Sequence, residues 1–153
     1  MKVALLSDTK CAPRYATDGA GCFDLFIDKA YTKVDWTPII IKSNDFIDLG
    51  NDYVANVVLN NVVAYRLNVP LGIKVEVPPD YVFDLFSRSG QAFKHNCTLA
   101  NSVGQIDSDF RGEVVAMLQS LEPFDITPDP VTGVIAVAQG RLVHAPRVYF
   151  EIV

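Results

Sequence analysis

The residues best suited to chemistry lie in one glycine-bracketed segment, Gly104 to Val114, which reads Gly-Gln-Ile-Asp-Ser-Asp-Phe-Arg-Gly-Glu-Val. It holds three carboxylates and one guanidinium and runs directly into an apolar stretch. Asp107 and Asp109 are two residues apart, so an extended backbone places both side chains on one face. One carboxylate there can take a proton from water while nearby groups orient a cation or a phosphate. Gly, Ser and Asp are also ordinary turn residues, so this segment alone identifies no function.

Two other segments carry groups that suit an anionic ligand or a cation. Asp24 follows the glycine-rich turn 16–21 and is embedded among hydrophobic residues, where a carboxylate needs a partner or an ion. Hydrogen bonds from turn amides are the alternative interpretation. Arg88, Ser89 and Gly90 come directly after an alternating strand. They offer a planar fork for phosphate oxygens, a small donor and a backbone that a ligand can approach closely.

The elements that must position these groups are short strands, because apolar residues come in β-branched or aromatic runs and hardly anywhere at helical spacing. Many short strands at close intervals predict a sandwich or barrel. One helical turn is expected near Gln91–His95. The predicted strands are 3–6, 23–27, 39–42, 53–59, 62–67, 71–77, 81–87, 113–121, 134–138, 141–144 and 148–153.

Two apolar runs, 54–59 and 62–67, flank Asn60 and Asn61 almost symmetrically. Asn tolerates positive φ, so the pattern predicts a hairpin with a two-residue turn there, within an insertion at about 50–69. The apolar arms need cover, either from their own core or from a neighbouring subunit near the site. A plain hairpin that extends its own sheet is the alternative.

Composition restricts the class of protein. The 153 residues are expected to form a single domain, 1–153. A formal net charge of −5 argues against a nucleic-acid or membrane surface. The three cysteines have no metal-ligand spacing and are odd in number, as in a reduced intracellular protein. The first apolar run is too short for a signal-peptide core, so a cytoplasmic protein is expected.

Taken in order, these segments resemble the motifs of the trimeric dUTP diphosphatase (dUTPase) family. The first motif is similar to Ala16–Leu25, the second to Arg88–Ala92 and the third to Asn101–Gly112. The fourth is matched in part by the stretch that ends in Ala138 and Gln139. The resemblance implies an all-β, jelly-roll-like fold with a distorted β-barrel, and a homotrimer with sites at its interfaces. It also implies hydrolysis of dUTP to dUMP and pyrophosphate with Mg²⁺.

The resemblance further implies a role for each matched residue. Asp107 would activate the water that attacks the α-phosphorus, and Asp24 would reach Mg²⁺ through water. Phe110 would pack on the deoxyribose, where a 2′-hydroxyl would collide with its ring. The other substrate contacts would be Arg88, Ser89 and Gly90 to the phosphates, Gln139 to the phosphates and water, and Asn101, Gly104, Gln105 and Ile106 around the uracil edge.

The sequence departs from the family pattern at three places. Ala136 occupies the position expected for an arginine in the fourth motif, and Arg141 or Arg147 would have to substitute for it. The segment 28–70 is longer than the family usually has. A glycine-rich C-terminal motif, which normally closes over the nucleotide, has no counterpart, and its loss should affect rate more than reaction type.

Two alternatives stay open at this point. One is the dCTP deaminase branch of the same fold, although its Asp-Pro-Gly-Phe motif fits the segment 107–110 poorly. The other is a catalytically weak or non-catalytic protein that keeps the nucleotide pocket as a binding or regulatory module.

Overall fold

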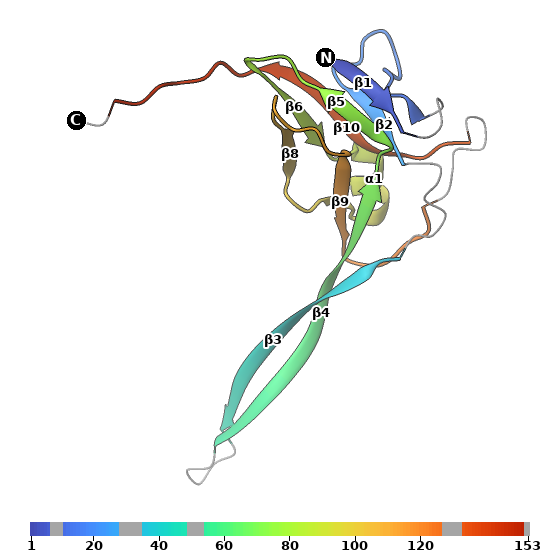
Figure 1. Cartoon of the computed structure of the whole chain (residues 1–153). Helices are drawn as coiled ribbons and strands as arrows, with labels where there is room; N and C mark the ends of the chain where they lie inside the picture. Colours follow the sequence, from blue (N-terminus) through green and yellow to red (C-terminus); the bar gives the residue numbers. More distant parts are fainter. Residues whose placement is uncertain (7–10, 28–34, 49–53, 127–132, 152–153) are drawn as a thin grey trace.

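The computed structural model describes residues 1–6, 11–27, 35–48, 54–126 and 133–151, and strands dominate these ranges (Figure 1). The all-β class predicted from the alternating apolar runs is therefore confirmed. The strands are β1 (Lys2–Leu5), β2 (Phe23–Phe26), β3 (Thr37–Asp48), β4 (Val54–Pro70), β5 (Ile73–Glu76), β6 (Tyr81–Phe86), β7 (Thr98–Leu99), β8 (Val103–Ile106), β9 (Val115–Ser120) and β10 (Ala136–His144), and the helix is α1 (Ser89–His95).

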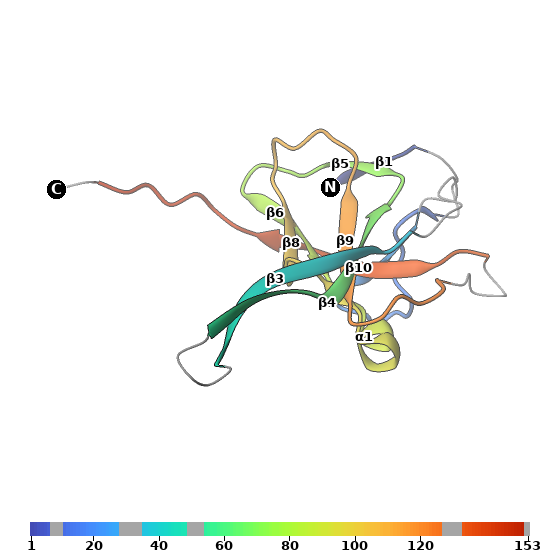
Figure 2. The same cartoon turned by 90° about the horizontal axis from the view of Figure 1, so that it is seen from below.

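The described strands form three antiparallel sheets. One has two strands in the order β1-β5, and two have four strands in the orders β2-β10-β6-β8 and β3-β4-β9-β7. The edge strands of the larger sheets do not pair with each other, so no closed barrel forms among the described residues. Figure 2 shows that β9 and β10 run in different directions through the body of the molecule, and that α1 lies at its lower side.

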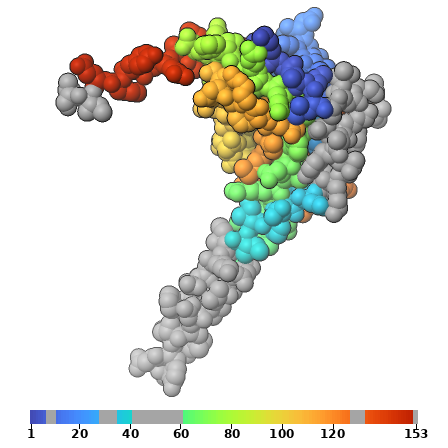
Figure 3. All heavy atoms as spheres, in the orientation of Figure 1, coloured from blue at the N-terminus to red at the C-terminus, as the bar shows by residue number. Residues whose placement is uncertain are grey.

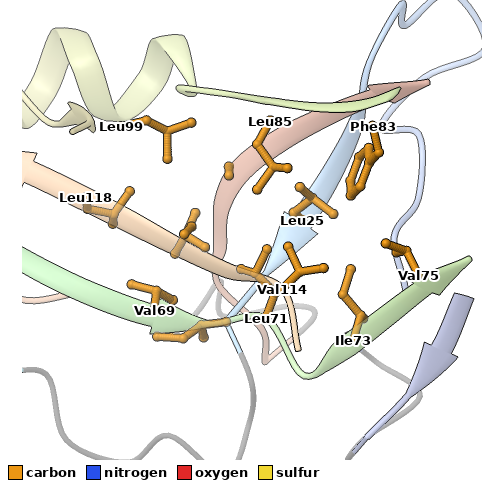
Figure 4. Packing of buried hydrophobic residues seen from close by; sticks show 14 of the residues in the cluster. Leu25, Val69, Leu71, Ile73, Val75, Phe83, Leu85, Leu99, Val114 and Leu118 are labelled. Atoms are coloured by element: carbon orange, nitrogen blue, oxygen red, sulfur yellow. The ribbon is translucent and has the colours of Figure 1, made fainter. Parts of the chain in front are cut away.

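The hydrophobic core lies between the two larger sheets, with β5 and the segment before it closing one side. Side chains of Leu25 and Leu85 from one sheet point toward Val69 and Leu118 from the other (Figure 4). On β9 the inward positions are buried and Val115 and Met117 point outward, as a strand with one covered face requires. This core holds the sheet β2-β10-β6-β8, and the candidate site residues lie on these strands or next to their ends.

Glycine 140 shows how tightly this core is packed. A Cβ atom at Gly140 would lie 2.5 Å from Cε2 of Phe83 and 2.7 Å from Cε2 of Phe23. Only glycine lets the two rings stack against the backbone of β10. The sequence predicts two strands, 134–138 and 141–144, whereas the structure has one continuous strand, β10.

The hairpin differs from its sequence prediction. Asn60 and Asn61 lie inside β4 and pair with Lys42 and Ile41 of β3, so the predicted two-residue turn is wrong. β-branched residues on both sides of the asparagines extend the ladder through them as far as the pair of Asp48 and Val54, and residues 49–53 lie outside the described residues. The hairpin projects from the body (Figure 1). Figure 3 shows the first residues of β3, in cyan, at the foot of the body. Only the end of β4 nearest the body, 65–70, pairs with β9, so within one copy the hairpin extends its own sheet.

The other predictions have mixed outcomes. The helical turn at 91–95 is confirmed as part of α1, which ends at Asn96 in the left-handed conformation. Strands β7 and β8 were missed because each is short. Residues 148–151 lie outside any strand, against prediction, and 152–153 are outside the described residues. The helix among the described residues has seven residues, far short of a membrane span.

Candidate active site

One group of polar residues gathers around Asp24, a carboxylate of β2 that is only 9% exposed. Arg88 Nε donates to its Oδ1 at 3.2 Å, and Gln139 Nε2 donates to the same atom at 3.4 Å. Asp24 and Gln139 face each other in the register of β2 and β10. The expectation that a carboxylate embedded among apolar residues needs a partner is met by a cation and an amide.

Arg88 is held by the backbone as well as by the carboxylate. Its Nη1 donates to the carbonyl of Ala136 at 3.0 Å, and Gln91 Nε2 donates to the same carbonyl at 3.2 Å. Arg88 is extended, with φ −88° and ψ 131°, and the following Ser89 and Gly90 open α1 at the surface. A Cβ atom at Gly90 would meet nothing within 4 Å, so the backbone there is open to a ligand.

A hollow of about 570 Å³ opens beside this group, large enough for a small-molecule ligand. Among the described residues, its wall contains three cationic side chains, Arg14, Arg88 and Lys94, and one carboxylate, Asp24. In a chain with a net charge of −5, this local surplus of positive charge favours an anion. Arg14 was not identified from sequence, because a backbone bridge to Asp24 is what brings it here.

The proposed substitutes for the missing arginine do not lie in this wall. The guanidinium of Arg141 stands 5.5 Å from the ring centroid of Phe86. Arg147 lines a different hollow of about 240 Å³, together with Asp107 and Asp109. Within one copy, neither residue therefore lies where an arginine at position 136 would be.

A second group of predicted residues lies on and after β8. Gly104 is buried against β6, where an added Cβ would stand 3.3 Å from Cβ of Leu85 and 3.5 Å from Nδ2 of Asn101. Gln105 Nε2 donates to Oδ1 of Asp84 at 3.1 Å, so this buried carboxylate of β6 fixes the direction of the glutamine side chain. Asp84 was also missed from sequence, since only the pairing of β6 with β8 places it there.

The loop after β8 presents Asp107 and Phe110 to solvent. The amide of Phe110 donates to the carbonyl of Asp107 at 3.2 Å, which closes the turn. Arg111 Nη1 donates to the carbonyls of Ser108 and Phe110, each at 2.8 Å, and braces the loop. Gly112 leaves room for the aromatic ring, because a Cβ atom there would lie 2.7 Å from Cζ of Phe110.

The two groups lie at opposite ends of β6. Phe83 pairs with Ile106 and Phe86 with Val103, so Asp107 falls next to the start of β6 while Arg88 follows its end. Six residues of extended chain separate these two levels, which corresponds to about 20 Å. A general base must lie within hydrogen-bond reach of its target, directly or through one water. In one copy, Asp107 therefore cannot act on a phosphate held by Arg88.

The similar proteins and the similar solved structures point to one family. No family model matches the chain. It is 32% identical to the deoxyuridine 5′-triphosphate nucleotidohydrolase of Caulobacter vibrioides, over 88% of this chain and 70% of that protein. The corresponding protein of Chlamydia pneumoniae is 38% identical over 52% of this chain, which spans 55% of its length.

Solved structures agree in fold. The dUTPase of Streptococcus mutans superposes with a TM-score of 0.61 at 18% identity, covering 98% of this chain and 100% of that one. The dUTPase of phage phi11 of Staphylococcus aureus, with a species-specific insert, gives 0.62 at 18% identity, covering 99% and 94%. A mutant of the phi11 protein shows the coordination of a structural Mg(II) ion. These likenesses confirm the all-β, jelly-roll-like fold.

Proposed function

The chain belongs to the dUTPase family, and from this premise we propose that it hydrolyses dUTP to dUMP and pyrophosphate at a site shared between copies of the chain. The main support for a shared site is the separation of about 20 Å between Asp107 and Arg88 within one copy. Each copy holds the phosphate-binding half of a site at one end of β6 and the general-base half at the other.

Joining the two halves requires a contact in which one end of a copy meets the opposite end of another copy. A two-fold dimer would make this contact twice across one interface, whereas a heterologous contact closes into a ring of three or more copies when the rotation allows it. The homotrimer that the family resemblance implies is a ring of this second kind. Exposed apolar side chains favour such an assembly: Val115 and Met117 on the outer face of β9 are 47% and 37% exposed, and Tyr149 and Phe150 are 89% and 88% exposed.

The chemistry assigned to the shared site is attack of water on the α-phosphorus. Asp107 takes a proton from that water, the new P–O bond forms as the bond to the bridging oxygen breaks, and pyrophosphate leaves. Arg88, Ser89, Gly90 and Gln139 of the other copy hold the phosphate chain in line. Phosphoryl transfer depends mainly on positioning and on neutralising charge, which these groups supply.

The residues of the cationic hollow fit a Mg²⁺ ion that is carried largely by the substrate. Protein sites for Mg²⁺ often supply one or two carboxylates and leave the rest to water and phosphate oxygens. Asp24 is the carboxylate in this wall, and the described residues contain no cluster of three groups that would form an all-protein cage. Asp24 would hold the ion through water, and the ion would neutralise phosphate charge.

Specificity would come from the β8 half of the site. Asn101 and the backbone from Gly104 to Ile106 would pair with the uracil edge, and cytosine would leave buried groups unpaired. The ring of Phe110, which is 37% exposed beside Gly112, would pack on deoxyribose and collide with a 2′-hydroxyl.

The test is turnover of the purified protein with Mg²⁺, measured as pyrophosphate release. The expected result is a kcat/KM for dUTP at least about 10²-fold above those for dCTP, dTTP and UTP. Equal values for dUTP and dCTP, or release of ammonia from dCTP, would support the deaminase branch instead. Binding of dUTP without turnover would support the non-catalytic alternative.

A further inference from the structure

We infer that Arg14 is a second phosphate-binding arginine, which holds the triphosphate from the side of β2 opposite Arg88. This inference rests on the proposed hydrolysis of dUTP. It concerns a residue that precedes the glycine-rich turn of the first motif and that neither its spacing nor its neighbours in the sequence single out.

The backbone fixes Arg14 beside the site. Its amide donates to the carbonyl of Asp24 at 3.3 Å, and the amide of Asp24 donates to the carbonyl of Arg14 at 2.8 Å. β2 is the edge strand of its sheet, so this bridge lies on its outer side, while Gln139 and Arg88 approach Asp24 from the inner side. The two arginines therefore flank the same carboxylate.

The side chain of Arg14 is oriented by an aromatic ring. Its Cζ lies 3.9 Å from the ring centroid of Phe26, a buried residue two positions after Asp24 on β2. Residues i and i+2 of a strand share a face, so the ring sets the guanidinium over the face that carries the carboxylate. When a guanidinium stacks on an aromatic ring, its N–H groups point outward in the plane of the guanidinium. A phosphate at the edge of the guanidinium can accept hydrogen bonds from them.

The charges in the wall of the hollow indicate why a second arginine would help to bind a triphosphate. A triphosphate carries several negative charges, and the ion pair with Asp24 offsets part of the charge of Arg88. Position 136 on β10 is an alanine, whose carbonyl accepts from Arg88 and Gln91. No side-chain cation comes from that position, and Arg14 lies in the same wall as Ala136. The guanidinium of Arg14 therefore supplies paired N–H donors to this wall, which the alanine at position 136 of β10 cannot supply.

The test is calorimetric binding of two probes, dUMP and the non-hydrolysable analogue α,β-imido-dUTP, with Mg²⁺ at fixed ionic strength. Arg14→Gln should weaken binding of the analogue by roughly 10- to 100-fold, the loss of a charge-assisted hydrogen bond, and leave dUMP within about twofold. Arg14→Lys, which keeps the charge and loses the fork, should fall between the wild type and Arg14→Gln. Arg66→Gln removes an exposed arginine of β4 that lines neither hollow, and should leave both affinities unchanged.

Two outcomes overturn the assignment. An unchanged analogue affinity in Arg14→Gln would remove Arg14 from the phosphate site, and an equal loss for dUMP and the analogue would show a structural role only. If Arg14→Gln does not fold, the analogue affinity of Arg14→Lys decides in the same way. Failure of the proposed function is distinguishable, because it shows in the wild type itself, which would then not hydrolyse dUTP whether or not it binds the analogue.

Discussion

At the scale of single residues, Asp107 and Arg88 have different roles in the proposed reaction: Asp107 accepts a proton and Arg88 binds phosphate. Asp107 is an exposed carboxylate in a braced loop, suited to accept a proton from water. Arg88 is half-buried and held by Asp24 and by the carbonyl of Ala136, so its guanidinium is oriented before any ligand arrives. Preorganised charge of this kind stabilises a developing transition state without a cost of reorientation.

Asp107→Asn tests the general base. The amide keeps the shape of the side chain and cannot accept a proton, so turnover of dUTP should fall roughly 10²- to 10⁴-fold. Binding of the imido analogue should stay close to that of the wild type. Asp109→Asn, in the same hollow, is the matched control and should lose far less activity. Near-normal turnover in Asp107→Asn would exclude the carboxylate from the mechanism.

Cys97 gives a prediction about pH. Burial raises the pKa of this thiol from 9.0 to about 11, so the folded protein keeps it neutral where the unfolded chain ionises it. The thiol then contributes stability that is complete below pH 9 and is lost as pH rises from 9 toward 11. Chemical denaturation of wild type and Cys97→Ala across this range should show the wild type losing its advantage above pH 9. A constant difference between the two proteins would refute the shift.

At the scale of elements, β6 organises the site because it pairs with β8 on one side and β10 on the other. Its register aligns Asp84 with Gln105 and Phe86 with Gln139. The ends of this strand therefore decide where each half of the site lies. Packing within the loops next to β6 and β8 then positions individual side chains, such as the ring of Phe110 over Gly112.

Gly112→Ala tests that fine geometry. The added Cβ would stand 2.7 Å from Cζ of Phe110, so the ring must move away from its present place over the loop. We expect roughly a tenfold fall in kcat/KM for dUTP, together with weaker discrimination against UTP. Gly19→Ala, where a Cβ meets nothing within 4 Å, is the control and should behave as the wild type. Unchanged discrimination in Gly112→Ala would separate Phe110 from sugar recognition.

The hairpin offers a second test at this scale. Ile41 and Asn61 are paired, so residues 42–60 can be replaced by Asn-Gly, a two-residue turn that fits the register. Within one copy the distal ladder joins only β3 to β4, so the melting temperature of the shortened protein should be unchanged. We expect kcat and KM for dUTP to be unchanged as well. A fall in kcat/KM with an intact fold would show that the hairpin covers the site of a neighbouring copy.

The sequence predicted the strand-rich class and the helical turn at 91–95, because these depend on local patterns. The assignment of residues such as Arg88 and Asp107 to a site comes from the resemblance to the dUTPase motifs and stays a prediction. Arg14 and Asp84 were beyond its reach, since a backbone bridge and a strand register bring them to the site. The turn expected at Asn60 was wrong because turn residues are tolerated within a long β-branched ladder. β10 was predicted as two strands, 134–138 and 141–144, because the contact of Gly140 with two distant rings is not visible in the sequence.

At the scale of the whole molecule, the distance along β6 is the main argument for an assembly. A chain with both halves of a site at opposite ends needs at least one neighbour to complete it. Surface apolar residues such as Met117 and Phe150 are consistent with burial against other copies. The proposed trimer predicts a solution mass three times that of the chain.

Complementation between two inactive variants tests the shared site most directly. Arg88→Gln removes the phosphate-binding half and Asp107→Asn removes the base, and melting temperatures check that each variant folds. Coexpression with different tags, followed by purification through both, gives mixed assemblies. The account predicts that mixed assemblies regain up to about a third of the activity of the wild type, because each mixed ring of three copies has one interface that joins an intact Arg88 half to an intact Asp107 half. Activity no greater than the sum of the two separate variants would contradict a site built from Arg88 of one copy and Asp107 of the next.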